Sequence, residues 1–127
     1  MFGEYINLPK NLIIKYRGKG EHMLPYQGIY VHKPQSFSKD IYVKQIKSSN
    51  DCYCAVYWYF NNETNMGAWT LTFCRSPDGE DLINEADPNN GNYGKGNFYA
   101  KGSIPIEEKY NDTNEDSEDQ FIVKFYE

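Results

Sequence analysis

The sequence has few of the residues and motifs that enzyme active sites require. It contains only two histidines and three cysteines in 127 residues. Neither His22 nor His32 lies near a serine nucleophile motif, and the chain has no glycine-rich phosphate loop. Carboxylates are abundant, but mainly in segments where a fixed acid-to-base separation is difficult to hold. We therefore predict a non-catalytic protein without catalytic residues or a cofactor, and we keep an enzyme with an unrecognised site as the least favoured alternative.

Long apolar runs are also missing. A transmembrane helix needs about 20 consecutive apolar residues, and no such stretch occurs. Residues 1–9 lack the basic and apolar regions of a secretory signal peptide. An odd number of cysteines is more typical of intracellular proteins than of secreted domains of this size. We expect a soluble intracellular protein, or a secreted one if a signal peptide precedes the chain.

Metal-binding motifs are absent as well. Cys52 and Cys54 are separated by one residue, whereas paired zinc ligands usually have at least two residues between them. The Asn-rich segment 87–98 has the composition of a calcium loop. An EF-hand, however, needs Gly at its sixth position and Glu at its twelfth, where this chain has Asn92 and Phe98. We therefore predict no metal site.

Aromatic residues are plentiful, with 12 Tyr and 7 Phe, and such side chains favour strands. Apolar and polar residues alternate with period two along most of the chain, between turns rich in Gly, Pro, Asn and Ser. The predicted strands lie near 4–6 and at 11–17, 26–33, 39–47, 53–60, 68–74, 98–106 and 121–126. We predict one all-β domain over 1–127, an antiparallel sandwich or flattened barrel of about seven or eight strands.

Two segments depart from this pattern. Residues 80–86 are predicted to form the one short helix of the fold, which Pro88 ends. Residues 107–120 are almost entirely acidic or polar and have too little apolar surface to offset the entropy of ordering. We expect 107–120 to be a mobile acidic loop.

A hairpin of two aromatic strands joined by a polar loop at 61–67 is the strongest pattern in the chain. The predicted register places Tyr59 opposite Trp69, and Tyr57 then lies on the same side of the ribbon. Tyr42, on a neighbouring strand, would extend this aromatic face. A slip of one residue would exchange the two faces.

This aromatic face has two interpretations, because a hairpin with two apolar sides is either buried on both or exposes one to a partner. If one side is exposed, we predict a protein-interaction module that uses this face or an exposed strand edge. Carbohydrate binding by Tyr57, Tyr59 and Trp69 is the alternative. The same register places Cys54 opposite Cys74, where a disulfide is geometrically feasible, although two packed free thiols are favoured.

Charge is unevenly distributed. Residues 1–50 contain eight Lys or Arg and three acids, whereas residues 51–127 contain five and fifteen. A basic face could therefore contact an acidic partner or an acidic segment of the chain itself, but two differently solvated sides of one domain are the favoured interpretation. The stretch Lys10, Lys15, Arg17 and Lys19 has residue types that contact phosphates, but no nucleic-acid motif is present and the net charge is −5. We do not expect nucleic acid as a partner.

Overall fold

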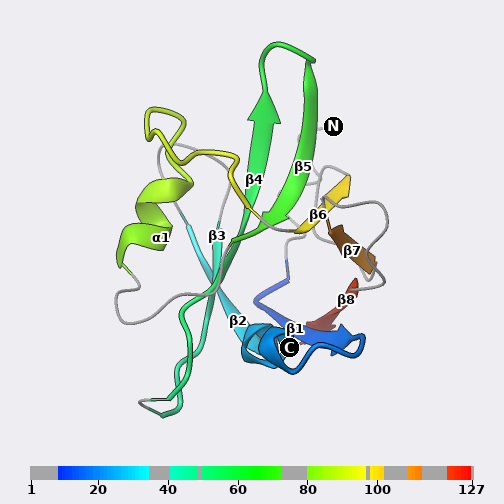
Figure 1. Cartoon of the computed structure of the whole chain (residues 1–127). Coiled ribbons are helices and arrows are strands. Elements are labelled where there is room, and N and C mark those ends of the chain that lie inside the picture. Colours follow the sequence, from blue (N-terminus) through cyan, green and yellow to red (C-terminus); the bar gives the residue numbers. More distant parts are fainter. Residues whose placement is uncertain are drawn as a thin grey trace.

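The computed structural model describes residues 9–34, 41–48, 50–72, 80–96, 98–101, 109–112 and 120–126. Its strands are all antiparallel, and each pairs with its neighbours in the chain (Figure 1). Strand β8 returns to pair with β1, which closes the sheet into a barrel. The strands are β1 (Asn11–Arg17), β2 (Gly28–Lys33), β3 (Ile41–Lys44), β4 (Ala55–Asn61), β5 (Met66–Leu71), β6 (Phe98–Lys101), β7 (Lys109–Asp112) and β8 (Gln120–Tyr126). The all-β prediction is confirmed.

The main core fills the barrel, because every second residue of a strand points inward. Each of its members is at most 5% exposed to solvent. They are Leu12, Ile14, Tyr26, Tyr30, Tyr42, Cys54, Val56, Trp69, Leu71, Phe121 and Val123. Buried phenols need hydrogen-bond partners. The Tyr30 hydroxyl donates to the Tyr26 carbonyl at 2.6 Å, and the Tyr42 hydroxyl donates to the Pro9 carbonyl at 2.7 Å.

A 3-10 helix, η2 (Glu21–Tyr26), packs against this core between β1 and β2. The ring of Tyr26 lies 5.1 Å from that of Phe121. Lys44, buried among these residues, donates a hydrogen bond to the Pro25 carbonyl, so its charge is not left without a partner. The prediction of at most one short helix did not include η2, because a single 3-10 turn has no sequence periodicity to recognise.

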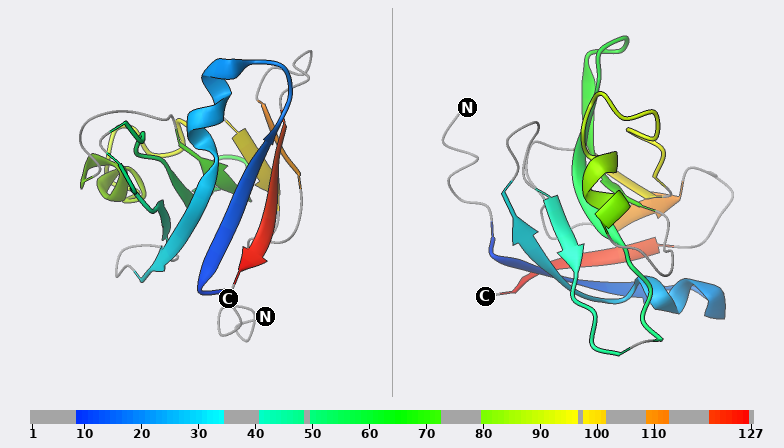
Figure 2. Two further views of the ribbon diagram at one scale, coloured as in Figure 1. Left: turned by 90° about the horizontal axis from the view of Figure 1, so that it is seen from below. Right: turned by 90° about the vertical axis from the view of Figure 1, so that its left-hand side faces the viewer.

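A second, smaller core lies outside the barrel. Helix α1 (Glu80–Glu85) packs over the outer side of β3 and β4 (Figures 1 and 2). The buried residues of this outer core are Ile41, Ala55, Tyr57, Leu82 and Ala86, and Val43, Tyr53, Tyr59, Ile83 and Tyr93 pack partly buried against them. The predicted helix over 80–86 is confirmed for 80–85.

The register of the β4–β5 hairpin differs by one residue from the prediction. Trp58, not Tyr59, lies opposite Trp69, and Asn61 lies opposite Met66. The loop is residues 62–65, three fewer than the predicted 61–67, because Asn61 extends β4 and Met66 begins β5. The Asn61 side chain also accepts the Glu63 N–H at 2.9 Å. Asn65 adopts a left-handed conformation with φ 61° and completes the turn. These contacts allow a tight turn and decide the register.

The acidic segment 107–120 is not a loop throughout. Its residues 109–112 form β7, which pairs with both β6 and β8. Backbone hydrogen bonds to strands on both sides give this polar stretch a stability that side-chain polarity alone does not predict. Residues 107–108 and 113–119, like the predicted strand at 4–6, lie outside the described residues.

Candidate functional site

The predicted aromatic face is not formed. Because of the one-residue shift, Trp69 points into the barrel with Tyr42, and their rings meet edge to face at 6.2 Å. Trp69 is 1% exposed and Tyr42 is fully buried. Tyr57 and Tyr59 point out of the barrel instead, and Tyr57 is buried in the outer core. Of the four predicted site residues, Tyr59 alone is partly exposed.

Trp58 takes the place expected for Tyr59 and extends the interior core along the hairpin. Its indole lies edge to face with that of Trp69 at 5.7 Å. Gly67, opposite Phe60, makes room for it, because a Cβ atom there would lie 2.0 Å from Trp58 Cζ2. The inner side of the hairpin is therefore packed around tryptophan.

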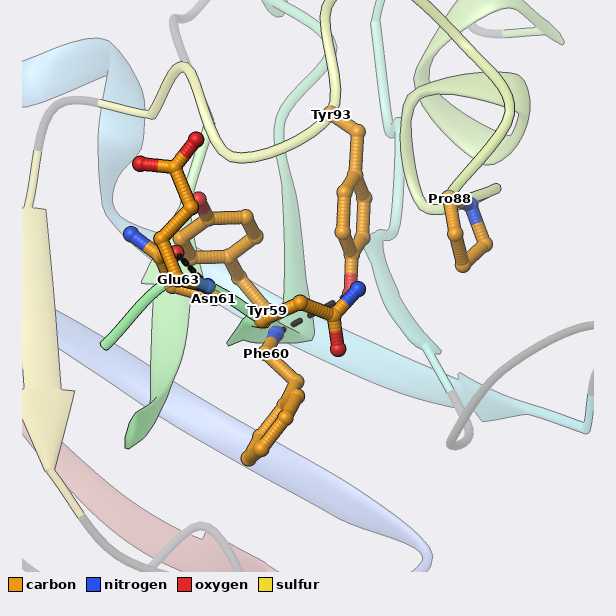
Figure 3. Close-up of a pocket in the computed structure, with 7 residues that line it drawn as sticks. Tyr59, Phe60, Asn61, Glu63, Pro88 and Tyr93 are labelled. Atoms are coloured by element: carbon orange, nitrogen blue, oxygen red, sulfur yellow. Dashed lines mark hydrogen bonds between the residues drawn. The ribbon is translucent and has the colours of Figure 1, made fainter. Parts of the chain in front are cut away.

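The outer side of the hairpin forms an open pocket of about 300 Å³ (Figure 3). We call it the tyrosine pocket. It is lined by Tyr59, Phe60, Asn61, Asn62, Glu63, Pro88 and Tyr93. The rings of Tyr59 and Tyr93 meet edge to face with centroids 4.8 Å apart. The pocket therefore combines an aromatic pair with amide and carboxylate side chains.

The loop that carries Tyr93 is shaped by its Asp and Asn side chains. Asp87 Oδ1 accepts the Asn89 N–H at 2.9 Å, and Asn90 Oδ1 accepts the Asn92 N–H at 2.8 Å. Each bond links a side chain to the backbone N–H two residues further on and so closes a turn, a role for which Asp and Asn are well suited. The Asn-rich composition of 87–98 is thus explained, over the described part of the loop, by folding.

Two phenols join the loop to β4. The Gly94 N–H donates to the Tyr57 hydroxyl at 2.6 Å, and the Phe60 N–H donates to the Tyr93 hydroxyl at 3.0 Å. Gly94 has φ +83°, a conformation that favours glycine. A Cβ atom at this position would also lie 2.4 Å from Tyr59 Cε1. Gly94 therefore lets the loop approach Tyr59 closely, which fixes the geometry of the pocket.

One phenol of the pocket has a shifted pKa. Burial raises the pKa of the Tyr93 phenol above its ordinary value, and the hydrogen bond from the Phe60 N–H opposes this only in part. The exposed side chains of Asn62 and Glu63 make no hydrogen bond within the described residues. The rim thus offers an amide and a carboxylate beside the rings of Tyr59 and Tyr93.

The other predicted sites have different outcomes. Cys54 is a buried free thiol in the barrel interior. Cys74 lies outside the described residues, and the register that predicted their pairing is not the observed one. In the described part of the chain, no three His, Cys, Asp or Glu side chains are grouped to hold a metal ion. No described helix has the length and apolar character needed to cross a membrane.

The sequence matches no protein family model, and comparisons with curated proteins and with solved structures find no similar chain.

Proposed function

We propose that the chain is a non-catalytic binding module with an antiparallel barrel fold, and that it recognises a protein partner through the tyrosine pocket. The observation that carries the proposal is an exposed methionine beside the pocket. Met66 is 53% exposed and lies opposite Asn61, on the same outer side of the hairpin as Tyr59. Exposed Met and Tyr side chains next to a concavity are enriched in protein interfaces.

The size and lining of the pocket support this proposal. A volume of about 300 Å³ accommodates one or two side chains of a partner. Tyr59, Tyr93 and Pro88 would contact its apolar part. Interface hot spots commonly consist of such an anchor in an aromatic pocket.

Strand addition along β4 is less well supported than the pocket. An added strand would need the outward backbone groups of β4. The Phe60 N–H is one of these groups, and it already donates to the Tyr93 hydroxyl. A peptide strand would have to displace Tyr93 and open the pocket, so we assign recognition to the pocket.

Carbohydrate binding is the second candidate. It is favoured by the exposed amide of Asn62 and carboxylate of Glu63 on the same rim as the tyrosine rings. Sugars present an apolar face to aromatic rings and hydroxyl groups to polar side chains. The absence of Trp69 from the pocket makes this site smaller than the predicted one.

Site-specific photo-crosslinking tests the proposal. A benzophenone amino acid at position 62 should cross-link a partner protein, and excess wild-type chain should compete. The same residue at position 19, away from the pocket, is the control. Tyr59→Ala should abolish cross-linking from position 62, whereas truncation of another partly exposed aromatic, Phe125→Ala, should preserve it.

A glycan array with the same two variants separates the second candidate. Suppose that a sugar binds the wild type and Phe125→Ala but not Tyr59→Ala, and that excess wild-type chain suppresses no cross-link. The ligand of the pocket would then be a carbohydrate and not a protein. If position 62 gives no cross-link that excess wild-type chain suppresses, and no glycan binds, the pocket is not a recognition site.

A further inference from the structure

A second surface lies on the far side of the barrel from the hairpin, over β8, β1 and β2 (Figure 2). Leu12 and Ile14 of β1 point inward, so the residues between them point outward. Ile13 stands between Lys124 of β8 and Ile29 of β2, and Lys15 stands beside Ile122. Further outward residues of β1, β2 and β8 are Lys15, Arg17, Val31, Lys33, Gln120, Ile122 and Lys124. We call these residues, with Ile13 and Ile29, the basic sheet face.

Three of its four cations have no counter-charge among the described residues. Lys15, Arg17 and Lys124 are exposed, and none forms an ion pair or a side-chain hydrogen bond with a described residue. Strands β1, β2 and β8 contain no Asp or Glu. The chain as a whole has a net charge of −5, so this positive surface is a local feature. It would attract an acidic partner.

The floor of the basic sheet face is aliphatic. Ile13, Ile29, Val31 and Ile122 are each partly exposed. Apolar residues at the centre with charged residues around them are the usual anatomy of a protein interface. The long stems of the lysines add further apolar surface.

We propose that the basic sheet face docks an acidic, amphipathic segment of a protein partner. Its acids would contact Lys15, Arg17 and Lys124, and its apolar residues would cover the isoleucines. Nucleic acid fits less well, because the floor of Ile13, Ile29 and Ile122 offers aliphatic side chains where base stacking needs rings, and an aromatic residue, Tyr126, occurs only at the end of the outward row, opposite Asn11. The negative net charge also opposes accumulation on a polyanion. This inference is independent of the tyrosine pocket.

Binding of a short fluorescent peptide of alternating Glu and Leu tests the inference. Fluorescence anisotropy should show binding that weakens as salt rises, because the charges are exposed. The double variant K15E/K124E should weaken binding about tenfold or more. K47E/K95E changes the net charge equally at exposed lysines elsewhere and should stay within about twofold of the wild type.

Two altered peptides separate charge from apolar contact. Replacing Glu by Gln, or Leu by Ser, should each weaken binding, and chemical-shift changes of the wild-type complex should map to β1, β2 and β8. Equal or tighter binding of the Ser peptide, heparin, duplex DNA or phosphatidylserine vesicles would overturn the inference in favour of a general anion surface. Absence of peptide binding would also overturn it. Tyr59→Ala should leave peptide affinity unchanged, so failure here is distinguishable from failure of the tyrosine pocket.

Discussion

The two packed regions of this molecule share β4, with the barrel core on one side and the outer core on the other. The barrel core is enclosed by strands that pair around a complete ring. Among the described residues, the outer core is covered by a six-residue helix and the loop that follows it. Neighbouring residues of one strand therefore differ in role. Trp58 belongs with the structural core, whereas Tyr59 belongs with the candidate site.

The tyrosines of the two regions use their hydroxyls in opposite ways. In the barrel, Tyr30 and Tyr42 donate to backbone carbonyls. In the outer core, Tyr57 and Tyr93 accept from backbone N–H groups. The interior phenols use their own protons in these bonds. The outer phenols accept the protons of backbone N–H groups, and their bonds join the loop after α1 to β4. This contrast leads us to expect that the loop can be loosened without unfolding the barrel.

The largest effect is expected for Trp69→Ala. The indole is almost fully buried in the barrel, so its removal should lower the free energy of unfolding by about 3–5 kcal/mol. Chemical denaturation measures this change. Trp69→Phe, which keeps a ring, should cost clearly less. A stable Trp69→Ala variant that had lost partner binding would show instead that Trp69 lies on an exposed aromatic face, as predicted from the sequence.

Leu82→Ala should have a smaller and more local effect. Leu82 is the fully buried contact of α1, and Leu→Ala changes cost about 2–5 kcal/mol in closed cores. We expect α1 to detach while the barrel persists, so the loss of stability should be about 2 kcal/mol, at the lower end of that range. Amide hydrogen exchange should accelerate at Gly94 and Phe60 but not in β1 or β8. Uniform acceleration in all strands would show that the two cores unfold as one.

Gly94→Ala should disturb the tyrosine pocket specifically. An alanine there combines a left-handed backbone with a contact to the Tyr59 ring, and we expect a loss of about 1–2 kcal/mol. Gly91→Ala in the same loop is the matched control, because a Cβ atom there meets nothing within 4 Å. Equal stability of the two variants would show that the loop does not approach Tyr59 as described.

The smallest effect concerns Tyr93 and pH. Its pKa is raised by burial, so its contribution to stability is fully present below the ordinary tyrosine pKa of about 10 and is lost as pH rises through the raised value. Tyr93→Phe removes the acceptor of the Phe60 N–H and should cost about 1 kcal/mol at neutral pH. The difference in stability between wild type and variant should shrink in strong alkali. A constant difference would contradict the raised pKa.

Alternation was sufficient to predict most strands, because one face of most of them is buried and the other is not. The prediction for β1 at 11–17 agrees with the structure at both ends. The helix at 80–85 was predicted from its position before Pro88. Strand β7 was missed, because its stability comes from backbone pairing with two neighbours and not from its own polar side chains.

The site could be predicted only in part, for a specific reason. Both faces of the hairpin are apolar, so hydrophobic pattern could not choose between two registers one residue apart. Tyr59 was identified, but Tyr93 and Pro88 were not, since they come from a loop far along the chain. The spacing of Asp87, Asn90 and Asn92 did contain a signal for a compact loop, because Asp87 and Asn90 each close a turn with their side chains.

The register of β4 on β5 is tested most directly by nuclear Overhauser effects between α-protons. Because the Phe60 N–H points away from β5 toward Tyr93, Trp58 and Trp69 form a non-hydrogen-bonded pair, in which the two Cα atoms are about 4.5 Å apart. We predict a strong effect between the α-protons of Trp58 and Trp69. A strong effect between Tyr59 and Trp69 in its place would return Trp69 to the outer side and contradict the separation of core and pocket.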